Sequence, residues 1–487
     1  MNKKFLDQRS QNRRFYITAA IPYVNAKPHI GHVLDFVQVD VVANYHKLLG
    51  ENVLALSGGD ENALKNVQAA EKSGEPIKEF IDKNSKFFYE LTRKLNVKLD
   101  VWQKGSDQNT HFPSSQKLWN LCLEDIYKKK YKGLYCVGCE VFYEKEELNQ
   151  DGECFEHPGI KLDEVEEDNY FFALSKYQDQ IIKLVESNEL EIIPQERKNE
   201  VLAFLKSGLR DISISRSNKR AKNWGVPVPG DDTQRIYVWF DALNIYQSGI
   251  GFGWDEEKYN KWWPADVHVI GKGIIRFHAV YWPAFLLSAG LKLPKKIFVH
   301  GYYTVNGQKM SKTLGNVYDP VPLLEKYGAD PLRYYCLAKT PPFTDGDFSE
   351  EKFFEAYNSD LANGLGNLVA RVAKLCEKEG FEFTIDVWRF EEEPFEKIRK
   401  NLDKFKFNEA LGIVWGWISD LDRKIETDKP WVLALDKLKL RLDDYINQIR
   451  MITTALAPFL PETSEKILVQ FAGPKITSQP PLFPRIK

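Results

Sequence analysis

Two short peptides carry side chains that could act on phosphates. His29-Ile30-Gly31-His32 follows an apolar run, and Lys309-Met310-Ser311-Lys312-Thr313 lies far along the chain. The N-terminus of a helix attracts phosphate through its unpaired N–H groups and its dipole. Two imidazoles at such a terminus and two ammonium groups on a loop could stabilise the negative charge that develops when a carboxylate attacks the α-phosphate of ATP. The two peptides therefore predict one ATP site that forms an adenylate and releases pyrophosphate.

The segments beside both peptides make this combination more specific than either peptide alone. Residues 20–25 read Ala-Ile-Pro-Tyr-Val-Asn, and Gly307-Gln308 and Leu314-Gly315-Asn316 flank the lysines. From about Phe15 to its last helices, the chain resembles the class I aminoacyl-tRNA synthetases, and most closely the methionyl enzymes. Thr313 stands where the family usually has Ser and keeps a hydroxyl. The resemblance implies catalytic roles for His29, His32, Lys309 and Lys312. It implies ATP contacts for Gly31, Gly271, Lys272, Lys309, Met310, Ser311 and Lys312.

The resemblance also implies an activity. Methionine and ATP, with Mg²⁺, would give methionyl-adenylate, and the methionyl group would pass to the 3′-terminal adenosine of tRNA(Met). One alternative keeps this chemistry with another amino acid, such as cysteine. A second alternative is a non-catalytic RNA-binding relative. The expected partners are ATP, L-methionine and tRNA, with no membrane, and the expected state is a monomer in the cytoplasm.

A methionine pocket needs apolar and aromatic walls for a polarizable thioether, and a carboxylate for the α-ammonium group. By resemblance, Asp60 accepts the ammonium. The other pocket residues implied by the family are Ile21, Tyr23, Trp239, Ala242, Tyr246, Ile274, Phe277, His278 and Trp282.

The chain departs from the family pattern at four positions. Asn62 and Ala63 stand where the family commonly has His and Gly, and Gly273 replaces an Asp. Ile212 stands where a Trp is usual. Arg216, four residues later, is kept and is expected to contact phosphate or the tRNA 3′-end.

Cysteines form a second candidate site. Cys136-x2-Cys139 is followed by Cys154-x2-His157. Three thiolates and an imidazole suit tetrahedral Zn²⁺, and four protein ligands leave no open position for chemistry. The spacing therefore predicts one structural zinc ion.

The elements that position these residues follow a strand–helix–strand order, which is typical of a parallel sheet. In such sheets ligands bind at the carboxyl ends of the strands. The expected strands are 15–21, 53–56, 236–240, 267–271 and 296–300, and the expected helices run from 32 to about 50 and near 277–289. The predicted fold class is α/β: a Rossmann-like parallel sheet split by a zinc-bearing connective insertion and followed by an α-helical bundle. The predicted divisions are a tail at 1–14, catalytic halves at 15–111 and 225–317, an insertion at 112–224, a stem-contact linker at 318–349 and an anticodon-binding domain at 350–487.

The insertion also bears on specificity. The similar Leu, Ile and Val enzymes carry a hydrolytic editing domain there, because one methylene gives only about 1–3 kcal/mol of discrimination. A short zinc-bearing insertion has no room for such a domain, which fits methionine. In the helical part, resemblance implies that Asn367, Arg371 and Trp431 bind the anticodon. An exposed Trp can stack on an unpaired base, whereas the alternative for Trp431 is a core position.

Composition sets broad limits. The chain has 487 residues, 43% hydrophobic and 28% charged, with a net charge of −2. This is typical of a globular protein and excludes a uniformly basic nucleic-acid coat. Basic clusters at 128–132 and 219–222 are expected to be solvated faces or a local tRNA surface. The first 14 residues are polar and lack the apolar core of a secretion signal. With only 6 cysteines, three of them clustered, a disulfide framework is not expected.

Overall fold

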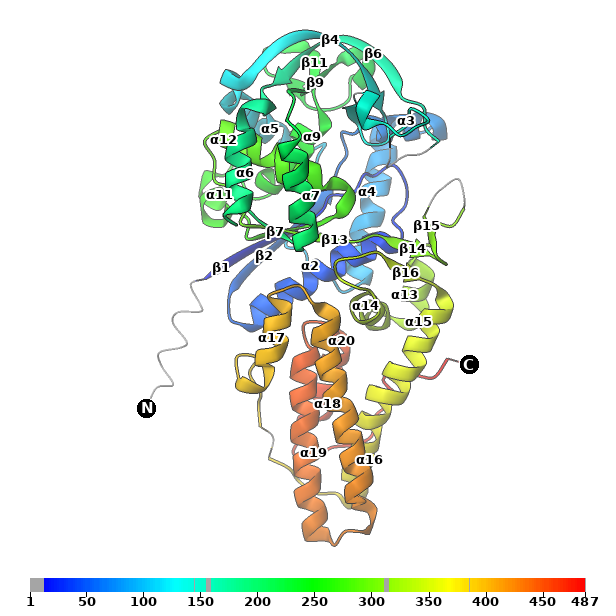
Figure 1. Cartoon of the computed structure of the whole chain (residues 1–487). Helices are drawn as coiled ribbons and strands as arrows, with labels where there is room; N and C mark the ends of the chain where they lie inside the picture. Colours follow the sequence, from blue (N-terminus) through cyan, green and yellow to red (C-terminus); the bar gives the residue numbers. More distant parts are fainter. Residues whose placement is uncertain (1–12, 144, 155–158, 311–314, 385, 487) are drawn as a thin grey trace.

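A computed structural model describes residues 13–486 apart from 144, 155–158, 311–314 and 385. Its largest sheet has six parallel strands in the order β3-β2-β1-β12-β13-β7. Figure 1 shows this sheet in the middle of the molecule. In spatial order, the strands are β3 (Val101–Lys104), β2 (Asn52–Gly59), β1 (Arg14–Ala19), β12 (Val267–Gly271), β13 (Lys296–His300) and β7 (Glu191–Ile193).

Helices cover both faces of this sheet, so its central strands are buried on two sides. Along β1, Ile17 belongs to the core beneath α2 (Ile30–Leu48), whereas Tyr16 belongs to the core on the opposite face. Successive side chains of a strand point to opposite faces, so one apolar run serves both cores. The first face carries α2 (Ile30–Leu48) and α4 (Ile77–Lys94); the second carries α9 (Val238–Leu243), α10 (Ile245–Ser248) and α12 (Trp282–Ser288).

Most predicted elements of the sheet are confirmed. Strands at 53–56, 267–271 and 296–300 and the helix before residue 50 form as expected. The predicted helix near 277–289 forms as a π-helical turn, η5 (Phe277–Tyr281), followed by α12. The predicted strand at 236–240 is wrong, because β11 (Asp231–Ile236) ends where α9 soon begins. All of Val238–Leu243 is buried, and a short, fully buried helix has the same continuous apolar sequence as a buried strand.

The region predicted as an insertion contains its own sheets. A long ribbon of β4 (Ile126–Cys136) and β6 (Asp163–Phe172) arches over the top of the molecule in Figure 1. The same region also supplies β7, the edge strand of the main sheet. The remaining elements of this region are α5 (His111–Leu121), β5 (Val141–Tyr143), α6 (Gln178–Glu186), α7 (Gln195–Lys206), β8 (Ile212–Ser213), β9 (Ser215–Ser217) and α8 (Asn218–Ala221). Three further elements lie outside it in the sequence: α3 (Leu64–Ser73), β10 (Pro227–Val228) and α11 (Glu256–Trp262).

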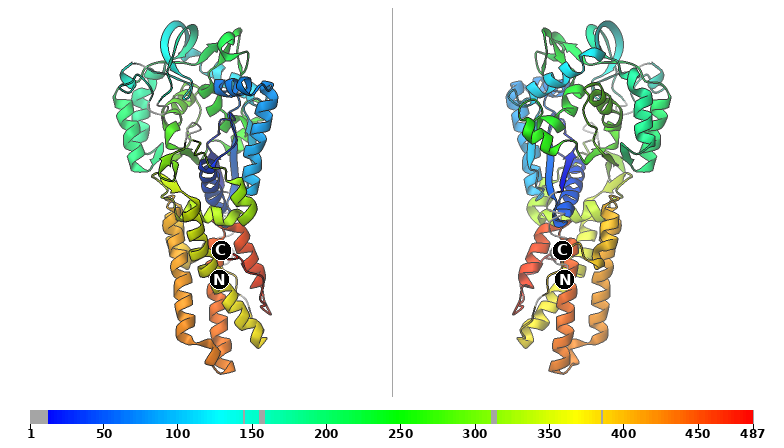
Figure 2. Two further views of the ribbon diagram at one scale, coloured as in Figure 1. Left: turned by 90° about the vertical axis from the view of Figure 1, so that its right-hand side faces the viewer. Right: turned by 90° about the vertical axis from the view of Figure 1, so that its left-hand side faces the viewer.

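Beyond the sheet, the chain becomes helical, as predicted. A small sheet of β15 (Gln308–Lys309), β14 (Tyr303–Val305) and β16 (Gly346–Phe348) lies at the transition. The helices then extend away from the sheet as an elongated bundle, which both views of Figure 2 show. They are α13 (Val321–Tyr327), α14 (Ala329–Ala338), α15 (Glu350–Ala356), the π-helical η6 (Tyr357–Gly366), α16 (Asn367–Glu379), α17 (Glu396–Leu402), α18 (Phe407–Asp428), α19 (Leu435–Leu456) and α20 (Pro461–Gln470).

Candidate active site

The first histidine peptide forms the N-terminus of α2. His29 is the N-cap residue: its Nδ1 accepts a hydrogen bond from the Gly31 N–H (3.1 Å), and its own N–H donates to His32 Nδ1 (3.1 Å). Because both Nδ1 atoms accept, each imidazole presents Nε2–H as a donor. Burial and the neighbouring His29 hold the pKa of His32 well below its usual value. Two imidazole donors therefore stand at a helix N-terminus, the arrangement expected of a phosphate site.

A cavity of about 570 Å³ opens at this helix terminus and at the carboxyl ends of β1 and β12. The structure thus brings both peptides and part of the predicted amino-acid pocket to one cavity. The predicted residues that line it are Ile21, Tyr23, His29, Gly31, His32, Trp239, Gly271, Ile274 and Met310. The predicted residues outside its lining are Asp60, Ala242, Tyr246, Lys272, Phe277, His278 and Trp282.

Aromatic side chains form one wall. The Trp239 ring stacks on Phe277 with centroids 3.6 Å apart, and Tyr23 meets Trp239 edge-on at 6.2 Å. Behind them, His278 Nδ1 donates to the Ile274 carbonyl (3.0 Å), so its Nε2 accepts from the Tyr246 hydroxyl (2.8 Å). Burial lowers the pKa of His278 to about 4, so this imidazole is neutral at pH 7. The wall is therefore apolar and uncharged, which suits a thioether.

Asp60 lies directly behind Tyr23. The two residues form a β-bridge, and the Asp60 N–H donates to the Pro22 carbonyl (2.9 Å). Burial, together with Glu140 and Asp241, raises the pKa of Asp60 well above its usual value, while Lys65 opposes this shift. A buried carboxylate in this position favours a cationic partner.

Sequence reasoning missed Lys65 and Glu140. The Lys65 ammonium lies 2.9 Å from the centroid of the Tyr23 ring and donates to the Gly138 carbonyl (3.1 Å). The Glu140 carboxylate accepts from the Lys65 N–H (3.1 Å) and pairs with Arg216 (2.9 Å). Arg216 is therefore buried against Glu140 and does not line the cavity. Neither Lys65 nor Glu140 belongs to a recognisable motif, and only the fold brings them to the pocket.

A second pair, missed for the same reason, lies beside the α2 terminus. His300, at the end of β13, pairs with Asp35, one turn after His32, and both line the cavity. Burial alone would lower the pKa of His300, but Asp35 outweighs it and the pKa is raised. An ion pair between an imidazole and a carboxylate therefore lies beside the predicted phosphate site.

The lysine peptide reaches the cavity only in part within the described residues. Met310 lines the cavity, and β15 ends at Lys309. Ser311, Lys312, Thr313 and the side chain of Lys309 lie outside the part that the structure describes. Lys272 forms an ion pair with Asp345 (2.8 Å).

The three clustered cysteines meet as predicted. Sγ of Cys154 lies 3.3 Å from that of Cys136 and 3.7 Å from that of Cys139, and all three lie within 4.8 Å of one another. The group could hold a metal ion. His157 lies outside the described residues. The same loop touches the pocket, because Trp239 Nε1 donates to the Cys139 carbonyl (3.1 Å).

In the helical part, Trp431 is exposed (51%), so the core alternative for this residue is wrong. Arg371 lies over its ring at 5.5 Å and pairs with Glu426 (2.7 Å). Asn367, one turn before Arg371, is also exposed. The three predicted anticodon residues therefore include an accessible ring with a guanidinium above it.

The two basic clusters carry ion pairs. On the β4–β6 ribbon, Lys130 pairs with Glu166 (3.0 Å) and Lys132 with Glu164 (3.4 Å). Arg220 pairs with Glu167 (3.3 Å). These clusters are therefore largely charge-balanced faces. Among the described residues, no helix is long and apolar enough to cross a membrane.

Several known proteins are similar to this chain. The family model described as "tRNA synthetases class I (M)" matches residues 15–373. The methionine–tRNA ligase of Thermotoga maritima is 40% identical over 93% of this chain and 74% of its own length. That of Brucella melitensis is 39% identical over 95% and 92%. The Mycobacterium tuberculosis methionyl-tRNA synthetase in complex with methionyl-adenylate superimposes with a TM-score of 0.91 at 35% identity, covering 97% of this chain and 100% of that one. The chain therefore belongs to the methionine type of the class I tRNA synthetase family.

Proposed function

We propose that this chain activates methionine with ATP to methionyl-adenylate and transfers the methionyl group to the 3′-terminal adenosine of tRNA(Met). One observation carries the proposal: the α2 terminus, the residue Met310 of the lysine peptide and the aromatic wall line one cavity. A carboxylate beside an α-phosphate at this helix terminus is the geometry that adenylate formation requires.

Each group has a proposed part in the reaction. The Nε2–H donors of His29 and His32 bind the phosphates, and Lys309 and Lys312 stabilise the charge that develops as pyrophosphate leaves. Asp60 binds the α-ammonium group, Tyr23 and Trp239 contact the thioether, and Phe277 supports the Trp239 ring from behind. Mg²⁺ accompanies ATP and offsets phosphate charge.

The proposed metal is one zinc ion held by Cys136, Cys139, Cys154 and His157. The convergent sulfur atoms of three cysteines fit the soft ligand set that zinc prefers. With four protein ligands, the ion would hold the loop that carries Gly138, Cys139 and Glu140 against the pocket, and it would take no direct part in the chemistry.

We further propose that Asn367, Arg371 and Trp431 bind the anticodon loop, and that the chain acts as a monomer. The exposed Trp431 ring under Arg371 supports stacking on an unpaired base.

Amino-acid-dependent ATP–pyrophosphate exchange tests the proposal. Methionine should support exchange far better than cysteine, leucine or isoleucine, and tRNA carrying a CAU anticodon should then be charged. Exchange with cysteine instead of methionine would favour the other amino acid. No exchange with any amino acid would favour a non-catalytic RNA-binding relative.

A further inference from the structure

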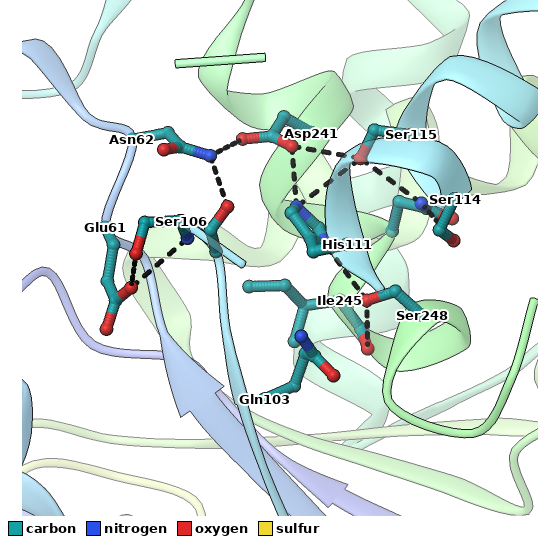
Figure 3. A network of polar contacts seen from close by, with 12 residues as sticks. Glu61, Asn62, Gln103, Ser106, His111, Ser114, Ser115, Asp241, Ile245 and Ser248 are labelled. Carbon is teal, nitrogen blue, oxygen red and sulfur yellow. Dashed lines mark hydrogen bonds and ion pairs between the residues drawn. The ribbon is translucent and has the colours of Figure 1, made fainter. Parts of the chain in front are cut away.

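The turn that carries Asp60 and the helix that carries Trp239 are connected by a buried polar network. Figure 3 shows this network, in which Asn62 and Asp241 face each other. Asn62 comes two residues after Asp60, and Asp241 comes two residues after Trp239. The hydrogen bond between them therefore joins two sides of the proposed amino-acid pocket.

The side-chain amide of Asn62 donates two hydrogen bonds through its nitrogen. Nδ2 donates to Asp241 Oδ2 (2.7 Å) and to the Gly105 carbonyl (2.7 Å). Next to it, the Glu61 carboxylate accepts from Ser106 Oγ (2.5 Å) and from the Ser106 N–H (3.2 Å). The turn after β2 is thus held against the segment after β3 as well as against α9.

Asp241 is a buried carboxylate with several donors. Besides Asn62, its Oδ1 accepts from His111 Nε2 (2.6 Å) and from Ser115 Oγ (3.0 Å). His111 Nδ1 lies 2.8 Å from Ser248 Oγ. Buried carboxylates are tolerated only when donors satisfy them, so the three hydrogen bonds to Asp241 stabilise the position of α9.

The serine, histidine and aspartate of this network resemble a hydrolytic triad in composition. A nucleophile must reach a substrate, however, and Ser115, His111 and Ser248 are fully buried (0% exposed). None of them lines the ATP cavity. The hydrogen bonds that reach Asp241 therefore hold α9 in place, and the network performs no chemistry of its own.

We propose that Asn62 is a positioning residue for the amino-acid substrate: its uncharged N–H donor keeps the Asp60 carboxylate in register with the Trp239 wall. This inference rests on the proposed function of the pocket. At this position the family commonly has an imidazole, which can also donate an N–H. In this chain the amide supplies that donor, so the exchange of His for Asn is compatible with an intact amino-acid site.

The charges around Asp60 support a requirement for an uncharged side chain. Burial first, then the carboxylates of Glu140 and Asp241, raise the pKa of Asp60. Another carboxylate at position 62 would add to this repulsion and would remove the donor from Asp241. Both effects weaken the binding of an ammonium group to Asp60.

The test compares Asn62→Asp with Ser248→Ala, a matched change in the same buried network that leaves the Asn62–Asp241 bond in place. For Asn62→Asp, we expect the methionine KM in ATP–pyrophosphate exchange to rise ~10- to 100-fold, as for loss of a hydrogen bond to a charged group. The ATP KM should stay within about twofold of the wild-type value, since the phosphate site is separate. Ser248→Ala should lower the melting temperature and leave the methionine KM unchanged.

A pH series adds a readout that loss of stability alone would not give. As the pH falls, the introduced carboxyl becomes protonated and can donate a hydrogen bond to Asp241, so the methionine KM of Asn62→Asp, divided by that of the wild type at the same pH, should decrease. If Asn62→Asp does not fold, Asn62→Ala is the test variant. Its methionine KM should rise about 3- to 10-fold.

Three results would overturn the inference: an unchanged methionine KM in the Asn62 variants, an equal rise in the ATP KM, or an equal effect of Ser248→Ala. The wild-type enzyme separates this outcome from failure of the proposed function. Methionine-dependent exchange by the wild type with unaffected variants would reject only the role of Asn62. No methionine-dependent exchange by the wild type would reject the function itself.

Discussion

Met310 lies against Gly31: a Cβ atom at Gly31 would come within 3.4 Å of Met310 Cε and within 2.9 Å of the His29 ring. The lysine peptide therefore reaches the first turn of α2 at a point where only a glycine leaves room. This close approach brings two motifs that lie far apart in the sequence to one cavity.

Lys309→Ala should reduce kcat for amino-acid activation by about 10²–10³-fold, with little change in the ATP KM. An ammonium group directed at charge that appears only in the transition state contributes to kcat and not to ground-state binding. Steady-state exchange kinetics measure both constants. A raised ATP KM at unchanged kcat would assign Lys309 to nucleotide binding instead.

Asp60→Asn should raise the methionine KM sharply, because the buried ammonium group loses its charged partner at a cost of about 2–5 kcal/mol. In the wild type, the pKa of Asp60 is raised, and only the charged form binds an ammonium group. Methionine affinity should therefore fall as the pH drops through that raised pKa, and calorimetry at several pH values should show it. The Asn variant should lose this dependence. Normal methionine binding by the variant would mean that Asp60 has another role.

Cys154→Ser should release the metal and loosen the loop that carries Cys139 and Glu140. Because Trp239 Nε1 donates to the Cys139 carbonyl, we expect the methionine KM to rise while the ATP KM stays close to that of the wild type. Elemental analysis should find one zinc ion per wild-type chain and none in the variant. Metal-free wild-type protein, purified without chelator and fully active, would contradict the prediction.

Trp431→Ala should leave adenylate formation unchanged and lower kcat/KM for tRNA charging by ~10- to 100-fold. Loss of one base-stacking surface typically costs about 1–3 kcal/mol, and the ring is exposed in the connection between α18 and α19, which does not line the cavity. Leu440→Ala, at an exposed apolar residue of α19, is a control that should not affect charging. Equal effects of both variants would indicate a general disturbance of the bundle.

Arg333→Met should destabilise the whole chain by about 3–5 kcal/mol, the usual cost of removing one partner of a buried ion pair. Arg333 and Asp40 are both fully buried and 2.7 Å apart. Chemical denaturation followed by tryptophan fluorescence would measure the loss. A change below 1 kcal/mol would mean that the site relaxes around the uncharged side chain.

The sequence pattern predicted β2, β12 and β13 because each contains a short, mostly apolar run. The predicted strand at 236–240 was wrong because every side chain there is buried, so the apolar residues show neither the helical nor the strand periodicity. The sequence pattern also gave no sign of β7, because these three residues form a strand only by pairing with β13.

The sequence predicted those residues of the site that belong to short motifs. His29, His32, Met310 and the three cysteines belong to short patterns with their own chemistry, and the fold brings each set together. His111, Asp35, His300 and Lys65 belong to no such pattern. Their partners lie on other elements, so their roles depend on tertiary packing that single-sequence reasoning does not reach.

Arg333 also connects the helix bundle to the helices that cover the sheet. Its guanidinium binds Asp40 on α2, the Leu95 carbonyl at the end of α4, and the Phe459 carbonyl (2.8 Å) between α19 and α20. The helix that begins with the two histidines is thereby fixed to the helix bundle without a hinge at this point. A displacement of the bundle at this contact would therefore act on α2 at Asp40, in the middle of the helix.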